Sequence, residues 1–318
     1  MNHTDENSEQ PLDFIRLLPV FIVYLAWGST YLAIRFGVRE GSGFPPFSFA
    51  SLRYLSAGVL LWVWGLLRKR RIRPTREEWP TLILSGLLMM LGGNGMVTWA
   101  EQRADSSLAA LLVAAVPIWV ILIESVLNKK PPSFRLVAAV LIGFGGIALL
   151  AVPGMLKGVQ AEILSIGALL VAGFSWALGS VRQVRKPVSL DPAMSSGYQM
   201  LAGGLGLFIL SRMAGEPVPT PSRESWMALV FLSLVGSILA FTAYVTALKT
   251  LPIHVVMTYT YVNPVIAVLL GWLILDEQIT GWTLGGMALV LLGVAGVFRE
   301  RYLRRRGQKS YAQTIVDH

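Results

Sequence analysis

The sequence predicts an all-α integral membrane protein with ten transmembrane helices, arranged as two inverted five-helix repeats. The chain of 318 residues is 54% hydrophobic and only 14% charged, and its mean hydropathy is +0.60. That composition leaves too little polar surface to cover a water-soluble globule of this size. Apolar runs recur along the chain, and the landmarks of its first half return in the second.

Each of the ten apolar runs is close to the roughly 20 residues that a helix needs to cross a hydrocarbon core of about 30 Å. The connections between them are short, so no sizeable soluble domain is expected. The runs lie near residues 17–37, 46–67, 80–100, 106–127, 134–152, 162–182, 193–212, 226–247, 253–275 and 281–298.

The lack of cysteine and the polar N-terminal segment each exclude one class of feature. The chain contains no cysteine, which excludes disulfides, thiolate metal sites and a cysteine nucleophile. The segment Met1–Gln10 is acidic and polar, whereas a cleavable secretory signal would carry a basic segment there. The first apolar run is therefore expected to remain as a membrane anchor.

The basic residues predict the orientation of the chain. With the N-terminus inside, the inner segments hold 20 of the 27 lysines and arginines, the outer segments hold 6, and Arg53 lies within the second run. This asymmetry follows the positive-inside rule for a protein with both termini in the cytoplasm. The net charge of +9 then reflects topology and attraction to anionic membrane lipid. Nucleic acid is not an expected partner, because no soluble domain is present to display a basic groove.

The two halves share a series of landmarks. Trp27 lies 90 residues before Pro117, and Trp176 lies 88 residues before Pro264. Because each half has an odd number of spans, the second copy enters the membrane in the opposite sense to the first. The predicted divisions are a cytoplasmic tail at 1–16, a first repeat at 17–152, a second, inverted repeat at 153–298 and a basic cytoplasmic tail at 299–318.

The segment from Tyr259 to Pro264 lies within the ninth run, and Pro117 has the corresponding place in the fourth. A proline inside a helix removes one backbone hydrogen bond, and Tyr259 and Asn263, four residues apart, share a helical face. Interrupted helices in corresponding places of two halves indicate the binding site of a transporter. The alternative is a kink that serves packing alone.

Other runs present aromatic and hydroxyl side chains on one face. Tyr24, Trp27 and Tyr31 share a face of the first run. That face is suited to stacking on a substrate, or equally to packing against a neighbouring helix. The sixth run offers Trp176 and Ser180, and the eighth offers Ser237, Phe241 and Tyr244.

Two charged residues fall within or beside the apolar runs. Arg53 in the second run would cost about 2.5 to 3.5 kcal/mol on insertion scales, so it needs a partner or a watery vestibule. Asn94, Thr98 and Glu101 share a face of the third run, and Glu101 reaches its outer end. Glu101 is expected to pair with Arg53 or to take up and release a proton. The alternative is a carboxylate solvated at the outer rim.

Four sets of residues form motifs: Trp27–Tyr31, Gly93–Thr98 with Ala100 and Glu101, Trp176 with Gly179 and Ser180, and Tyr259–Pro264. Together these motifs resemble the EamA-type drug/metabolite transporters, and within that family the YedA-like inner-membrane permeases. The resemblance covers residues 17–298. It implies ten helices in two inverted repeats around a central cavity. It also implies export of amino acids, metabolites or toxic compounds, either proton-linked or facilitative.

The motifs and helical faces give one set of candidate site residues. Arg53 and Glu101 are candidates for proton coupling or gating. The expected function is an exporter of small compounds working by alternating access, and an uncoupled facilitator or exchanger working in either direction is the alternative. The candidates for substrate binding are Trp27, Tyr31, Asn94, Trp176, Tyr244, Tyr259 and Asn263.

Neither a cofactor nor direct use of ATP is expected, because the sequence lacks a phosphate-binding loop of the Gly-x-x-x-x-Gly-Lys-Ser/Thr kind. An integral-membrane enzyme is disfavoured, because such enzymes need histidine or acidic clusters at membrane depth, and this chain has a single histidine away from its termini. The expected partners are a small-molecule substrate, membrane lipid and protons. The oligomeric state does not follow from the sequence, which is compatible with a monomer.

Overall fold

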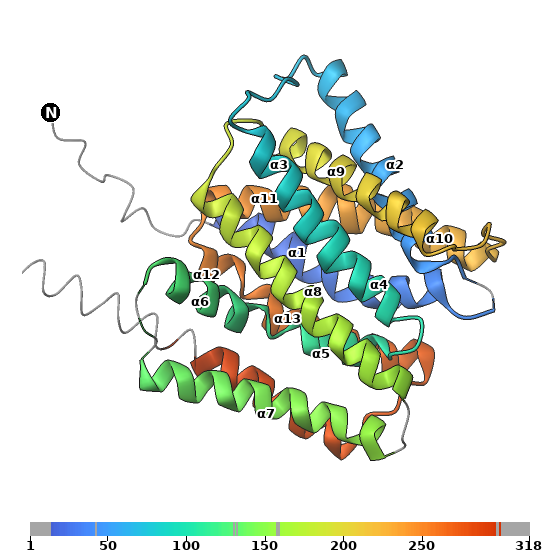
Figure 1. The fold of residues 1–318 in the computed structure, drawn as a ribbon, viewed down its shortest axis with the longest axis vertical. Coiled ribbons are helices and arrows are strands. Elements are labelled where there is room, and N and C mark those ends of the chain that lie inside the picture. The colour runs from blue at the N-terminus through green and yellow to red at the C-terminus, as the bar shows by residue number, and fades with distance from the viewer. Residues whose placement is uncertain are drawn as a thin grey trace, which may run out of the picture.

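In the computed structural model, residues 14–41, 43–129, 131, 133–156, 160–296 and 299 are described. Most of the two predicted tails lies outside these residues. Within the described residues all regular structure is helical, and Figure 1 shows long helices that run back and forth through the molecule.

The helices of the first half begin with α1 and α2, and the third span is one helix built from α3, η1 and α4. The fourth span is split into α5 and α6. The bounds are α1 Phe14–Val38, α2 Pro46–Leu67, α3 Trp79–Gly86, η1 Leu87–Gly95, α4 Met96–Ala100, α5 Ser106–Val113, α6 Val116–Leu127 and α7 Phe134–Leu156.

The second half follows the same plan, with one helix built from α10, η2 and α11 and with a short α12 before α13. The bounds are α8 Gln160–Arg185, α9 Pro192–Met213, α10 Arg223–Phe231, η2 Leu232–Leu239, α11 Ala240–Thr250, α12 Ile253–Val256 and α13 Tyr259–Leu275. A further apolar helix covers Gly281–Gly296.

The expectation of an all-helical membrane protein is confirmed. Within the part of the chain that the structure describes, seven helices are long and apolar enough to cross a membrane, and three shorter apolar helices cover Phe134–Leu150, Tyr259–Leu275 and Gly281–Gly296. Large apolar side chains also face outward, for example Leu25 at 72% and Leu273 at 69% exposure. Such exposure would be costly in water and is favourable against lipid tails. A total of ten spans and the inverted arrangement remain predictions.

Hydrogen bonds between distant connections define the two ends of the helix bundle. At one end, here called the Glu101 end, Glu216 contacts the start of α2 and Glu277 contacts the start of α5. At the opposite end, here called the Arg71 end, the connection after α2 contacts the one after α8. Each end therefore gathers connections from both halves of the chain.

Helix α7 and the helix over Gly281–Gly296 run alongside each other at the lower edge of Figure 1. They meet through glycines: a Cβ added at Gly146 would lie 2.6 Å from the Val290 nitrogen, and one at Gly293 would lie 2.5 Å from the Gly143 nitrogen. Small residues allow such backbone approach in membrane bundles.

The structure places the helix interruptions differently from the expectation of two proline kinks. Ala114 and Ala115 separate α5 from α6, so Pro117 stands in the first turn of α6, where its missing N–H is harmless. In the ninth span, Met257 and Thr258 separate α12 from α13, and Pro264 lies inside α13. The chain is thus interrupted six residues before Pro264.

Two π-helical segments were not foreseen. They are η1 in the third span and η2 in the eighth, each continuous with α-helix on both sides. The wider turn of a π-helix leaves an extra residue in the helix, and such segments are frequent at functional sites. Each segment contributes to the candidate site: η1 carries Asn94, and η2 carries Gly236 and Ser237.

Candidate functional site

A cavity of about 50 Å³ lies where the two halves of the chain meet. Since a buried water needs roughly 10 to 15 Å³ of such volume, the cavity has room for a few waters. It is too small for a metabolite, so the surrounding side chains must move apart to admit one. Six of the nine candidate residues line it, namely Trp27, Tyr31, Arg53, Asn94, Trp176 and Tyr259.

Trp27 of α1 is the centre of an aromatic cluster that closes the cavity. Its ring centroid lies 5.3 Å from that of Trp176, 5.0 Å from that of Tyr244 and 5.2 Å from that of Tyr259. The rings of Trp176 and Tyr259 meet it edge to face, an arrangement favoured by aromatic quadrupoles. The Trp27 indole also donates to the Gly236 carbonyl at 3.0 Å, which holds the ring against η2.

Tyr244 supports this cluster from behind and does not line the cavity. Its side chain is fully buried, and its hydroxyl lies 2.8 Å from the Ser180 hydroxyl. Ser180 donates to the Trp176 carbonyl, one turn earlier on α8. The pairing of Trp176 with Ser180 that the sequence indicated therefore serves to position the rings.

Asn263 likewise lies outside the cavity lining. With its amide nitrogen turned toward them, it donates to the carbonyl oxygens of Tyr24 at 3.3 Å and Tyr259 at 3.2 Å. The Tyr24 hydroxyl lies 2.5 Å from that of Thr258 in the same region. These contacts join α1 to α13, so the observed position of Asn263 is that of a helix-joining residue.

Arg53 projects from α2 into the cavity and is 3% exposed. Its Nε donates to the Ser237 hydroxyl at 2.8 Å, and its guanidinium carbon lies 4.8 Å from the centre of the Tyr54 ring. Within the described part of the chain, no carboxylate lies within ion-pair distance of it. The expected direct contact with Glu101 is not formed.

Glu101 is completely buried, and neither carboxylate oxygen has a hydrogen-bond partner among the described residues. The alternative prediction, a Glu101 carboxylate solvated at the outer rim, is therefore wrong. Arg35 donates to its backbone carbonyl at 2.6 Å. Glu101 is the residue after the end of α4 at Ala100, and it is not part of the cavity lining.

Two glutamates at the Glu101 end bind helix N-termini that are far away in the sequence. Glu277 accepts from the Ser106 nitrogen at 2.8 Å and the Ser107 nitrogen at 3.1 Å, at the start of α5. Glu216 accepts from the nitrogens of Phe47 and Ser48 at 2.8 and 2.7 Å, at the start of α2. Carboxylates are favoured there because the first N–H groups of a helix have no partner within it.

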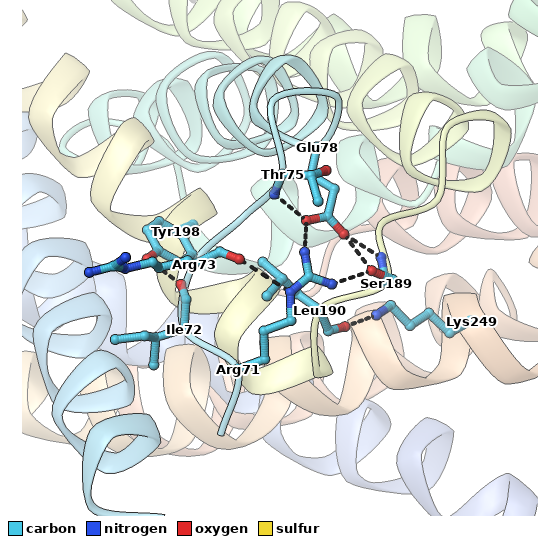
Figure 2. A network of polar contacts seen from close by, with 9 residues as sticks. All are labelled: Arg71, Ile72, Arg73, Thr75, Glu78, Ser189, Leu190, Tyr198 and Lys249. Atoms are coloured by element: carbon cyan, nitrogen blue, oxygen red, sulfur yellow. Dashed lines mark hydrogen bonds and ion pairs between the residues drawn. The ribbon is translucent and has the colours of Figure 1, made fainter. Parts of the chain in front are cut away.

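Figure 2 shows the corresponding network at the Arg71 end. Glu78 accepts from the Ser189 nitrogen at 2.7 Å, from the Thr75 nitrogen at 2.8 Å and from Arg71 at 2.8 Å. Burial raises the pKa of Glu78, but the hydrogen bonds from Thr75 and Ser189, with the charge of Arg71, outweigh that effect and lower the pKa to about 2. Lys249 donates to the Leu190 carbonyl beside this network.

Sequence reasoning missed part of the site. The small and apolar side chains that line the cavity have no feature that distinguishes them in the sequence. Glu216 and Glu277 each bind a helix more than 160 residues away in the sequence. Arg53, Asn94 and the aromatic residues did have a signal in the sequence, because a charged or polar group is rare within an apolar run and the rings share helical faces. The missed lining residues include Thr30, Ile34, Val97, Val113 and Ala172.

Comparison with known proteins gives consistent results. The EamA-like transporter family matches residues 15–152 and again residues 163–299. The inner membrane transporter YedA of Escherichia coli K12 is 37% identical over 289 residues, which cover 88% of this chain and 89% of that protein. The transporter YoaV of Bacillus subtilis is 26% identical over 281 residues, covering 87% and 94%. These names describe transporters, not enzymes.

A solved structure supports the fold alone. One crystal structure of a protein 22% identical to this chain aligns with a TM-score of 0.64, covering 89% of this chain and 97% of the other.

Proposed function

Because the chain belongs to the EamA-like transporter family, we propose that it is a secondary transporter that exports a small metabolite, amino acid or drug-like compound by alternating access. Family membership implies a small-molecule substrate and a lipid environment. The observation that carries the proposal is the cavity lined by both matched ranges, with Trp27 and Asn94 from the first and Trp176 and Tyr259 from the second. A site shared in this way changes its accessibility when one half tilts against the other.

The proposed architecture is ten spans in two inverted repeats, with both termini in the cytoplasm. The two matched ranges support the division at about residue 152. The π segments support it too, because η1 begins at Leu87 and η2 at Leu232, in the third span of each half. The orientation relies on the distribution of basic residues, which places the Arg71 end inside.

Contacts at the Glu101 end are consistent with an outer gate that is closed in this structure. Glu277 and Glu216 each join a connection of the second half to a helix of the first half. Opening toward the outside would break such contacts. Movement of α5 away from Glu277 is therefore part of the proposed transport cycle.

Proton coupling through Glu101 is the finer part of the proposal. A buried carboxylate without a hydrogen-bond partner is costly in its charged form, and the charges of Arg35, Arg53 and Glu277 act on it. A specific observation favours an uncoupled facilitator or exchanger instead: Glu101 is not among the residues that line the cavity.

Flux into proteoliposomes that contain the purified protein tests transport. A panel of amino acids, nucleosides and amphipathic drugs should contain at least one compound whose uptake needs the protein. Absence of flux for the whole panel would contradict the proposal.

Glu101→Gln separates the coupled transporter from the facilitator. In a coupled transporter, an imposed pH gradient drives accumulation by the parent protein, and the variant loses that accumulation but keeps exchange of labelled for unlabelled substrate. Glu40→Gln, an exposed residue near the same end, is the control and should behave as the parent. Accumulation that persists in the Glu101 variant would exclude this carboxylate as the proton carrier.

A further inference from the structure

We propose that Arg53 is the substrate-binding residue for a carboxylate, so that the transported compound is an organic monoanion with an apolar or aromatic body. The inference rests on the proposed transport function and specifies the class of substrate. The juxtaposition behind it is a guanidinium that no described carboxylate contacts at ion-pair distance, placed in a cavity of aromatic rings.

The protein holds the guanidinium of Arg53 in place but takes up only part of its hydrogen-bonding capacity. Its Nε donates to Ser237, and Tyr54 lies under the charged plane. A Cβ on Gly236 would lie 2.9 Å from Nη2, so the glycine leaves room for this group. Among the described residues, Nε is the guanidinium nitrogen that donates to the protein, and the side chain as a whole lines the cavity.

An arginine stays charged at any physiological pH, and a buried charge needs a partner. In the described structure Glu101 acts on Arg53 through its charge alone, because its carboxylate oxygens make no hydrogen bond, and no described carboxylate is in ion-pair contact with the guanidinium. The planar guanidinium presents parallel N–H groups that match the two oxygens of a carboxylate. The missing partner is therefore expected to arrive with the substrate.

The rest of the lining selects among anions. Among the described residues, Arg53 supplies the charged side chain of the lining, with no acidic and no second basic side chain beside it, so one positive charge faces one ligand. This matches a carboxylate better than a phosphate monoester, which carries up to two charges. The rings of Trp27, Trp176 and Tyr259 provide an apolar surface for the body of the ligand, and the Asn94 amide adds one neutral polar group.

The test measures binding by thermal shift of the detergent-purified full chain. Its probes share one ring and differ in the head group: phenylacetate, phenylacetamide, phenethylamine and phenyl phosphate. We expect phenylacetate to raise the melting temperature at lower concentration than the other three. Arg53→Gln should weaken phenylacetate binding by roughly tenfold or more, since a charged hydrogen bond is lost. Arg53→Lys keeps the positive charge but lacks the parallel N–H groups of the guanidinium. Its affinity for phenylacetate should therefore lie between those of the parent and Arg53→Gln.

The controls separate binding from folding. Arg39→Gln, an exposed arginine at the Glu101 end, should bind phenylacetate as the parent does. Size-exclusion profiles and helical circular dichroism establish whether each Arg53 variant is folded. If Arg53→Gln does not fold, the comparison of Arg53→Lys with the parent decides the test.

Four results would overturn the inference: no binding of phenylacetate, equal binding of phenylacetamide, preference for phenethylamine or phenyl phosphate, or undiminished binding by the Arg53 variants. Counterflow in proteoliposomes distinguishes failure of the proposed carboxylate site from failure of the transport proposal. Binding of phenylacetate without flux of any compound would contradict transport alone. Flux of neutral compounds that is insensitive to Arg53→Gln would contradict the anion site alone.

Discussion

At the scale of single residues, the cavity owes its shape to hydrogen bonds that the rings make outside it. Trp27 is fixed by the Gly236 carbonyl, and Tyr244 is fixed by Ser180. Neither contact touches the open space. Because Tyr244 does not line the cavity, a substitution there tests stability without removing a lining side chain.

Tyr244→Phe should lower the free energy of unfolding by about 1 kcal/mol, because it removes the hydrogen bond between the Tyr244 and Ser180 hydroxyls and leaves the Ser180 hydroxyl without this partner. Tyr54→Phe is the matched control, since the Tyr54 hydroxyl is buried and has no hydrogen-bond partner among the described residues. Its stability should stay within about 0.5 kcal/mol of the parent. Thermal unfolding in detergent compares the two. Equal losses would mean that the Ser180 contact does not stabilise the fold.

At the scale of elements, glycine positions decide how closely helices approach. Gly145 and Gly146 are neighbours on α7, yet an added Cβ meets Val290 from Gly146 and nothing within 4 Å from Gly145. The difference arises because successive residues of a helix point about 100° apart. Only one of the two faces the helix over Gly281–Gly296.

Gly146→Ala should destabilise the protein by about 1 to 3 kcal/mol, because two helix backbones would have to separate. Gly145→Ala should be neutral, or stabilising by up to about 1 kcal/mol, because alanine favours a helix more than glycine does. Melting temperatures of the two variants in the same detergent test this. A Gly146 variant as stable as the Gly145 variant would show that the helices do not meet at this contact.

At the scale of the whole molecule, the pair α2 and α9 shows the relation between the halves. The connection after α9 supplies Glu216 to the start of α2, and the connection after α2 supplies Glu78 to the segment just before α9. One exchange lies at each end of the bundle. This reciprocity is what a two-fold axis in the membrane plane would produce, and it supports the proposed inversion.

The absence of cysteine makes the proposed topology directly testable. Thr220→Cys lies at the Glu101 end and Arg76→Cys at the Arg71 end, and both positions are exposed. In intact cells, a membrane-impermeant maleimide should label the cysteine at position 220, whereas the one at position 76 should react only after permeabilisation. The reverse pattern would invert the proposed orientation, and labelling of both in intact cells would contradict a span arrangement that separates them.

Hydropathy, charge and large rings were sufficient to predict much of this protein. The span positions follow from the sequence because the bilayer acts on each segment separately and requires an apolar helix. For the same reason Arg53 and the rings of Trp27, Trp176 and Tyr259 stood out within apolar runs, and the structure brings all four to one cavity.

The sequence alone thus determined a helical membrane protein, the positions of its apolar helices and most of the large side chains around the cavity, because those properties depend on local composition. The tertiary structure decided which polar groups face that cavity. Asn263 turns to the carbonyl oxygens of Tyr24 and Tyr259, and Glu101 is buried outside the cavity lining. Glu277 reaches a helix 170 residues away. Such partners depend on how helices pack and where they are interrupted, and periodicity within one helix carries no information about either.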